Sequence, residues 1–292
     1  MTQATIAFAV AEAYPLCEDD QLAVDALNEI GFVVDAQIWN DPDVNWDDYP
    51  VVVVRSPWDY FYKSEQYRVW VESFQKNNNT HLLNSPEAIL ANIDKAYLLE
   101  FEQQGIPIVP SVLLEQGSQE NLPGILLKQN WNKVVIKPSI SGGAWKTWCC
   151  DRDLAPAKQQ KFTQQLQEHA VLIQPFLPEI VDHGELSVIF FNGKYSHSVL
   201  KKAKARDFRV QDVHGGSSEA IEPSPDTIKQ CERVLATQKS ELLYARVDGI
   251  IRNDTFLLME LEINEPSLFF AYSSTAPKAF AAAVKAQLEA IS

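Results

Sequence analysis

Four consecutive valines, residues 51–54, constrain the fold of this chain more than any other feature of its sequence. Successive side chains of a strand point to opposite faces, so an unbroken apolar run needs cover on both faces. Such strands lie in the middle of parallel sheets, where crossover helices provide that cover. The valine run therefore predicts an α/β layer with a central parallel strand.

Strand-like and helix-like patterns alternate around the valine run. The predicted elements are strands at 5–10 and 32–39 and helices at 19–31, 64–75 and 94–105. Gly31 is expected to cap the end of the first helix, and Asp94 the start of the last. Two prolines within 105–111 then break the helical pattern. We therefore expect an N-terminal α/β lobe over residues 1–105.

The pattern beyond residue 105 indicates short strands and hairpins. We expect strands at 133–138, 145–150, 171–176, 185–191, 194–202, 244–252 and 255–264, with helices near 155–168, 225–238 and 276–290. Asn192-Gly193 is a type I′ hairpin signal, and Asn253-Asp254 joins the last two strands. Residues 203–223 read as a long irregular loop. These elements predict an antiparallel α+β unit in the second half of the chain.

The charge of the chain excludes several partners. A formal net charge of −14 repels phosphate backbones and anionic membrane surfaces, so neither nucleic acid nor a membrane is expected as a partner. The basic cluster at 201–209 is short and suits a small anion. The N-terminus has no basic region before its short apolar run, and the four cysteines lack metal-binding spacing. We therefore expect a cytoplasmic protein with reduced thiols.

Oxygen-bearing side chains repeat along the predicted strand 255–264. Glu260, Glu262 and Asn264 share one face of that strand, and Asp248 lies on the preceding strand within reach across the hairpin. Hard oxygen ligands of this kind suit Mg²⁺. The alternative is a solvated polar face, because alternation is normal in any half-exposed sheet.

Three lysines occupy the ends of predicted elements. Lys137 ends a buried strand, Lys95 opens a helix and Lys201 ends a hairpin strand. Each alone fits a lysine that reaches water. Together with the Gly142-Gly143 loop and the carboxylates, they supply the charges and flexible backbone that a triphosphate with bound Mg²⁺ requires.

The order of these motifs over residues 80–290 resembles the ATP-grasp superfamily. The stretches that carry the resemblance are, in order, NIDKAYL, VVIKPSISGG, VLIQPFLPEI, GELSV, YARVDGI and MELEINEP. The branch around bacterial glutathione synthetase is most similar. Within it, VRSPWDYF, DFRVQDVHGGS and ELEINEPSLFF resemble the O-ureido-serine cyclo-ligase of cycloserine biosynthesis and its uncharacterised relatives. The resemblance implies an ATP-grasp fold, in which the N-terminal α/β lobe precedes two α+β lobes, over 106–176 and 177–292, that enclose the nucleotide.

The resemblance also implies roles for individual residues. The implied nucleotide ligands are Lys95, Lys137, Ser141, Gly142, Gly143, Gln174, Phe176, Leu177 and Glu185. The implied metal ligands are Asp248, Glu260, Glu262 and Asn264, for Mg²⁺ with Mn²⁺ as an alternative. Alignment on Pro266 favours Glu260 and Glu262 and leaves Asn264 open. Lys201 and Arg209 are the implied catalytic residues, with Arg209 as an oxyanion donor.

The implied activity is ATP-dependent ligation of a carboxylate to an amine through an acyl phosphate. The substrate is expected to be small and amino-acid-like, ligation within one molecule is an option, and a homodimer is the default assembly. Two alternatives remain: a nucleotide-binding module without catalysis, and a small-molecule kinase on the same fold.

The acceptor is expected at the carboxyl end of the valine strand, where ligands bind in open α/β sheets. Arg55 follows the valines and can hold a substrate carboxylate, or alternatively pair with Asp59. Ser56, Trp58, Asp59 and Tyr60 complete the predicted pocket. His197 and His214 are either proton carriers or structural residues.

Overall fold

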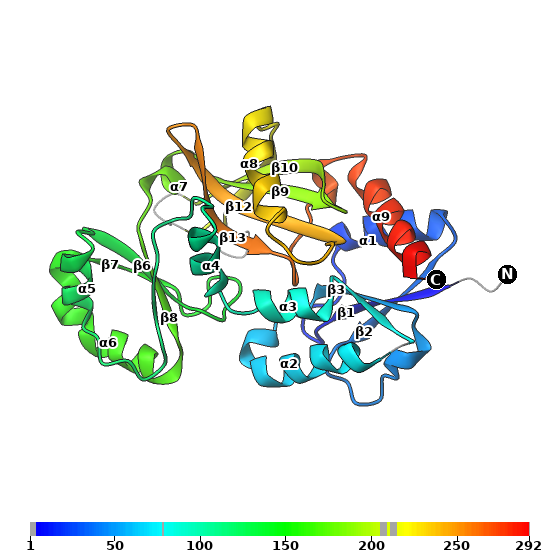
Figure 1. Ribbon diagram of the computed structural model, residues 1–292, viewed down its shortest axis with the longest axis horizontal. Coiled ribbons are helices and arrows are strands. Elements are labelled where there is room, and N and C mark those ends of the chain that lie inside the picture. The colour runs from blue at the N-terminus through cyan, green and yellow to red at the C-terminus, as the bar shows by residue number, and fades with distance from the viewer. Residues whose placement is uncertain (1–3, 78, 205–208, 211–214, 292) are drawn as a thin grey trace.

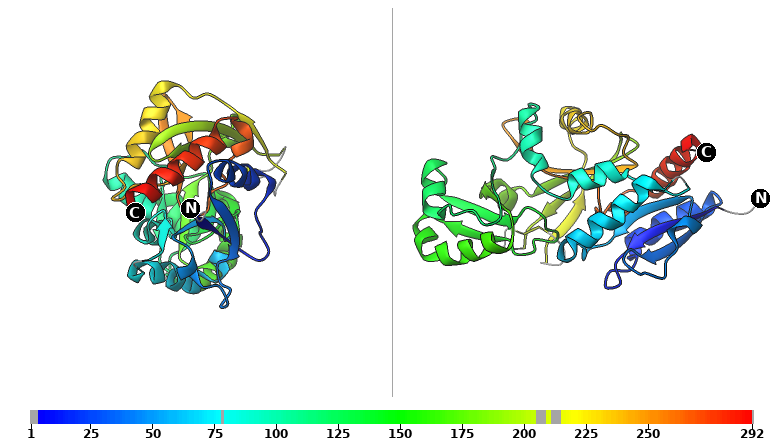
Figure 2. Two further views of the ribbon diagram at one scale, coloured as in Figure 1. Left: turned by 90° about the vertical axis from the view of Figure 1, so that its right-hand side faces the viewer. Right: turned by 60° about the horizontal axis from the view of Figure 1, so that its bottom comes forward.

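A computed structural model describes residues 4–77, 79–204, 209–210 and 215–291 of the chain (Figure 1). It contains three sheets, and each of the three predicted lobe ranges holds one of them. The five-stranded sheet lies between the other two parts of an elongated molecule (Figures 1 and 2). The mixed α/β architecture that the sequence predicts is thus confirmed.

The first sheet is parallel and has the strand order β2-β1-β3-β4. Its strands are β1 (Thr5–Val10), β2 (Val33–Ile38), β3 (Val51–Ser56) and β4 (His81–Leu83), and its chain segment includes α1 (Glu18–Glu29), α2 (Ser64–Ser73) and α3 (Pro86–Asn92). The valines of β3 are fully buried. Val51 and Val53 pack in a core with α1, whereas Val52 and Val54 pack in another with α2 and α3. Helices thus cover both faces of β3, as the run of four valines predicts.

The second sheet is antiparallel, with the order β5-β8-β6-β7. Its strands are β5 (Val112–Leu114), β6 (Lys133–Pro138), β7 (Trp148–Asp151) and β8 (Val171–Pro175). The helices α5 (Leu122–Lys128) and α6 (Ala155–Glu168) pack with Val134 and Ile136 on one face. Because side chains alternate along β6, Lys137 lies on the other face.

The third sheet is antiparallel and has the order β11-β10-β9-β12-β13. Its strands are β9 (Glu185–Phe191), β10 (Lys194–Lys202), β11 (Ser217–Ala220), β12 (Tyr244–Arg252) and β13 (Thr255–Glu262). One face packs against the helices α4 (Tyr97–Gln103) and α8 (Pro225–Leu235). Both predicted turns are confirmed, since Asn192, Gly193, Asn253 and Asp254 all have positive φ.

Several short elements differ from the sequence predictions. The helix expected over 94–105 begins only at Tyr97, and α3 precedes it with Ser85 as its N-cap. The segment 203–223, expected to be irregular, contains the edge strand β11. The elements β5, α5 and α7 (Pro178–Asp182) were also not predicted. They have three to seven residues each, too few for a periodic pattern to stand out.

The last helix, α9 (Ala276–Ile291), returns to the first sheet. Its Phe280 and Val284 share a core with Ile6 and Phe8 of β1, and α9 lies beside α1 (Figures 1 and 2). The chain thus closes by packing its two ends together.

A buried ion pair links the first sheet to the segment after β13. The Arg55 guanidinium donates to one carboxylate oxygen of Asp20 at 2.9 and 3.0 Å, and to the carbonyl oxygen of Pro266 at 3.1 Å. Asp59 accepts instead from Trp39 and Lys63, so the predicted alternative of an Arg55–Asp59 pair is wrong. Arg55 is 1 % exposed, and its contacts join the N-terminal lobe to the segment after β13.

The described residues contain no helix that is both long and apolar enough to cross a membrane. None of the four cysteines forms a disulfide within the described residues.

Asp20→Asn tests the importance of this buried pair. Removing one partner leaves the Arg55 charge uncompensated, so we expect the free energy of unfolding to fall by about 3 kcal/mol or more. Urea denaturation measures this change, and Asp25→Asn, at an exposed site on the same helix, is the matched control. Equal stability of the two variants would contradict the structural role of the pair.

Candidate functional site

The uncovered face of the third sheet carries a layer of charges. Glu185 on β9 pairs in register with Lys201 on β10. On the neighbouring strands, Asp248 lies opposite Glu260, and Arg246 lies opposite Glu262. The strands alternate, so these side chains face away from the apolar core under α4 and α8. Acidic and basic groups therefore meet on one surface.

Asp248 lies at the centre of this charged layer and is 1 % exposed. Its oxygens accept hydrogen bonds from Arg246 at 2.9 Å, Lys201 at 3.1 Å and Ser187 at 2.6 Å. Burial opposes its charge, but the two cations hold the pKa of this carboxyl below its usual value. The predicted metal ligand Asp248 is thus engaged by protein donors here, and its role as a metal ligand stays a prediction.

Glu262 and Glu185 lie at opposite sides of Asp248. Glu262 lies 2.5 Å from Arg246, and Glu185 lies 2.6 Å from Lys201. Burial raises the pKa of Glu262 to about 8, although Arg246 acts in the opposite direction. Arg246, which the sequence analysis missed, joins two of the predicted acidic ligands. Its position two residues before Asp248 puts both on one face and was the available signal.

Two lysines from different lobes approach Glu260. Lys95 Nζ lies 2.9 Å from the Glu260 carboxylate and 2.5 Å from the carbonyl oxygen of Ser141. Lys137 is half-buried on β6 and forms no ion pair within the described residues. Burial lowers the pKa of the Lys137 ammonium, and Lys95 adds to this, whereas Glu260 opposes it. An anion placed between the two lysines would relieve their mutual repulsion.

The loop 139–147 follows β6 and closes against the N-terminal lobe. A Cβ atom on Gly142 would lie 3.0 Å from the Phe61 ring, so only glycine fits without displacing that ring. The Trp145 ring lies 5.4 Å from Phe61 and 5.2 Å from Tyr62, between centroids. Gly143 has a φ of 55°. The loop is thus shaped by its glycines and held by aromatic contacts.

An apolar patch adjoins the charged layer at the end of β8. Leu177 is buried and packs with Val109 and Ile250, with Met259 partly buried against them. A bulge in the β12–β13 pairing shifts Met259 to this patch. Without the bulge, simple alternation along β13 would place Met259 on the face of Leu261.

Gln174 and Phe176, two further predicted nucleotide ligands, lie near this patch at the end of β8, in a segment here called the hinge. The Gln174 side chain donates to Ser111 at 2.9 Å, and the Phe176 backbone N–H donates to the carbonyl of Lys133 at 2.8 Å. The Lys133 ammonium lies 4.3 Å from the centre of the Phe176 ring. The hinge is therefore held rigidly against β6.

Asn264 lies at the joint between lobes and not with the carboxylates. Its side-chain oxygen accepts from the Tyr67 hydroxyl at 2.5 Å, and its backbone oxygen accepts from Tyr244 at 2.9 Å. The role of Asn264 as a metal ligand, which the sequence leaves open, stays a prediction. Within the described part of the chain, no three acidic, histidine or cysteine side chains are grouped to hold a metal ion.

The predicted acceptor residues pack against the segment after β13. The Ser56 hydroxyl donates to the carbonyl of Tyr14 at 2.7 Å, and Trp58 donates to the carbonyl of Glu265 at 3.0 Å. Burial raises the pKa of Glu265 to about 7, although Lys95 and the nearby Tyr60 hydroxyl oppose this shift. Glu265 was missed because it breaks the alternation of 260, 262 and 264.

The remaining predicted residues lie around this site. His197 Nε2 lies 3.0 Å from the carbonyl oxygens of Leu268 and Phe269, and burial lowers its pKa, which favours its structural interpretation. Arg209 is half-buried, and its catalytic role stays a prediction. His214 lies outside the described residues.

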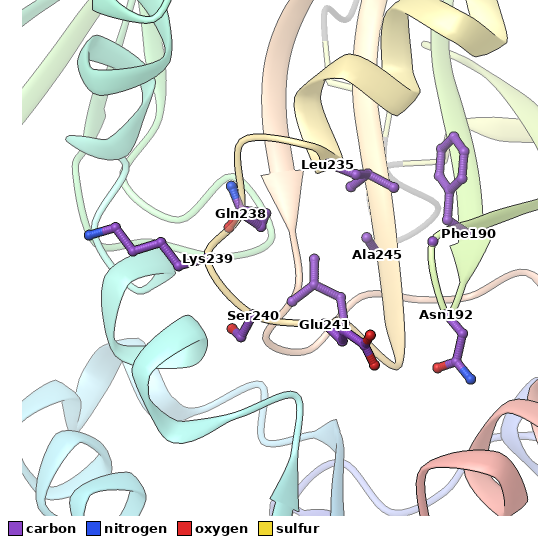
Figure 3. Close-up of a pocket in the computed structure, with 10 residues that line it drawn as sticks. Phe190, Asn192, Leu235, Gln238, Lys239, Ser240, Glu241 and Ala245 are labelled. Carbon is purple, nitrogen blue, oxygen red and sulfur yellow. The ribbon is translucent and has the colours of Figure 1, made fainter. Parts of the chain in front are cut away.

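A separate hollow lies away from these residues, between the loop after α8 and the end of β9 (Figure 3). Lys239 and Glu241 line it on one side and Asn192 on the other. It contains none of the predicted site residues.

The chain is similar in sequence to known ligases and biosynthetic proteins. Residues 6–84 match the family described as the N-terminal domain of D-cycloserine synthetase DcsG. The cycloserine biosynthesis protein DcsG of Streptomyces lavendulae is 24% identical, over 96% of this chain and 97% of its own length. Glutathione synthetase of Rhodopseudomonas palustris is 25% identical, over 77% of this chain and 68% of its own.

Solved structures agree with the sequence similarity. The crystal structure of D-cycloserine synthetase DcsG superposes with a TM-score of 0.87 at 23% identity, covering 98% of this chain and 100% of the other. D-alanine–D-alanine ligase from Bacillus anthracis, solved with ATP, gives 0.68 at 13% identity, covering 99% and 98%. The chain therefore has the fold of these ligases, the ATP-grasp fold, and its sequence is similar to that of DcsG over nearly its full length.

Proposed function

We propose that the protein is an ATP-dependent ligase that joins a carboxylate to an amine. The observation that carries the proposal is the convergence of Lys95, Lys137 and the loop 139–147 on the carboxylate of Glu260. These groups come from two lobes and surround one point with cations and flexible backbone. Such an arrangement suits the phosphates of a nucleotide.

The nucleotide is proposed to lie between the second and third sheets. Lys95 and Lys137 would contact phosphate oxygens, and Ser141, Gly142 and Gly143 would cover them. The apolar patch around Leu177 offers a surface for the adenine ring, beside the hinge of Gln174 and Phe176. Glu185, paired with Lys201 at the same face, is proposed as the ribose ligand.

Glu260 and Glu262 fit a divalent metal. They share one face of β13, and Mg²⁺ takes one or two carboxylates and completes its ligands with phosphate and water. Mn²⁺ prefers the same oxygen ligands. When bound, the metal would neutralise the charge that spreads over the transferring phosphoryl group.

The chemistry follows from the charges of the site. A substrate carboxylate oxygen bonds to the γ-phosphorus, the bond to the bridging oxygen breaks, and ADP leaves. The amine nitrogen then attacks the acyl carbon, loses a proton and expels inorganic phosphate. Lys95 and Lys137 would stabilise the phosphates in the first step, and Arg209 the oxyanion in the second. Closure of the loop 139–147 would exclude water from the acyl phosphate.

The names of the relatives favour an amino-acid-like substrate, because glutathione and D-alanyl-D-alanine are made from amino acids. Similarity to DcsG over nearly the whole chain keeps ring closure within one molecule as an option. A kinase on the same fold would release ADP but no inorganic phosphate.

Lys137→Ala tests the nucleotide site. Loss of the ammonium removes a charge that faces the phosphates, so we expect the Kd for MgATP to rise by about tenfold or more. Isothermal calorimetry measures it, with Lys128→Ala, exposed on α5, as the control. An unchanged Kd would contradict the proposal that the second sheet contributes to the nucleotide site.

Glu260→Gln tests the proposed metal ligands. The change keeps the shape and removes a charge, so kcat should fall about 100-fold while ATP affinity changes less. Glu262→Gln should act in the same way. In contrast, Asn264→Ala should lower thermal stability and affect turnover less, because Asn264 joins the lobes. If Asn264→Ala lowers turnover more than Glu262→Gln does, the proposed metal ligands Glu260 and Glu262 are wrong.

A further inference from the structure

Glu265 differs from the other carboxylates around the site in its charge balance. Glu185, Asp248, Glu260 and Glu262 each form an ion pair with a lysine or an arginine. Glu265 forms none among the residues that the structure describes. A half-buried carboxylate without a cation is costly, so a cation from outside the protein would be favoured there.

The Glu265 side chain is held in place from several directions. Trp58 fixes its backbone oxygen, and Arg55 fixes the carbonyl of the next residue, Pro266. One oxygen of its carboxylate lies 3.9 Å from where a Cβ of Gly142 would be, and the Tyr60 hydroxyl lies near the same carboxyl. The carboxylate thus lies under the glycine loop at the boundary with the N-terminal lobe. Such preorganisation suits a binding group.

Aromatic rings surround this boundary. Tyr60 and Phe61 lie 5.7 Å apart between ring centroids, and Tyr14 and Trp58 also lie 5.7 Å apart. Ammonium groups bind to a carboxylate beside aromatic rings through charge and cation–π attraction. A metal ion prefers several oxygen ligands, and the described residues contain no group of three acidic, histidine or cysteine side chains that could hold one.

We propose that Glu265, positioned by Tyr60, binds the ammonium group of an amino-acid substrate. The inference rests on the proposed ligase function and adds to it a residue that would recognise substrates of one class, acids that carry a free amino group. Recognition at this point would hold the substrate under the loop 139–147, next to the lysines proposed to bind the phosphates.

The test compares amino acids with their deamino counterparts, which have the same acyl chain without the amino group. ADP release is measured for both sets with the wild-type protein. For the amino acid with the highest activity, Glu265→Gln should raise KM by about tenfold or more, because a charge-assisted contact is lost. The preference for the amino acid over its counterpart should collapse, while the Kd for MgATP stays unchanged.

Two further variants control this result. Glu232→Gln, at an exposed site on α8, should leave KM unchanged. Tyr60→Phe should raise KM less than Glu265→Gln does, and it serves as the test if the latter fails to fold.

Three outcomes overturn the inference. If the folded variants keep the preference for the amino acid over its deamino counterpart, Glu265 does not bind the substrate. If only the Mg²⁺ dependence of ADP release shifts, Glu265 is a metal ligand instead. Release of ADP only with acids that lack an amino group leaves the ligase proposal intact but excludes this substrate class. If no acid supports release, both proposals fail.

Discussion

The network of buried ion pairs on the third sheet is the interaction on which the rest of the site depends. Isolated buried charges cost several kcal/mol each, so Asp248 is stable only because Arg246 and Lys201 contact it. These cations also hold Glu262 and Glu185. The layer therefore fixes the direction of β13, on which Glu260 meets Lys95. A ligand whose charges complement those of this layer would bind to it without a change in the position of the strands.

The N-terminal lobe takes part in the site through the segment after β13. Arg55 and Trp58 bind the carbonyl groups of Pro266 and Glu265, and Tyr67 binds Asn264. The loop 139–147 then rests on the aromatic side chains of the same lobe. The sheet that was predicted to bind the acceptor through Arg55 thus contacts the backbone of another lobe, next to the carboxylates of the candidate site.

The sequence predicts local features of this protein well and distant contacts poorly. The valines of β3 and the Asn192-Gly193 turn follow from local rules, since burial pattern and positive φ are properties of short segments. The Arg55–Asp20 pair joins residues 35 positions apart, and no periodicity marks it. The bulge at Met259 and the inward position of Glu265 were missed for a related reason. Both break the alternation on which the prediction relied.

Transfer of oxygen from the substrate to phosphate tests the central claim of carboxylate activation most directly. An amino acid that supports ADP release is labelled with ¹⁸O in its carboxyl group, and the released inorganic phosphate is analysed by mass spectrometry. Ligation through an acyl phosphate predicts that the phosphate gains one ¹⁸O atom for each molecule of product. Unlabelled phosphate, or a phosphorylated product without phosphate release, would contradict the account.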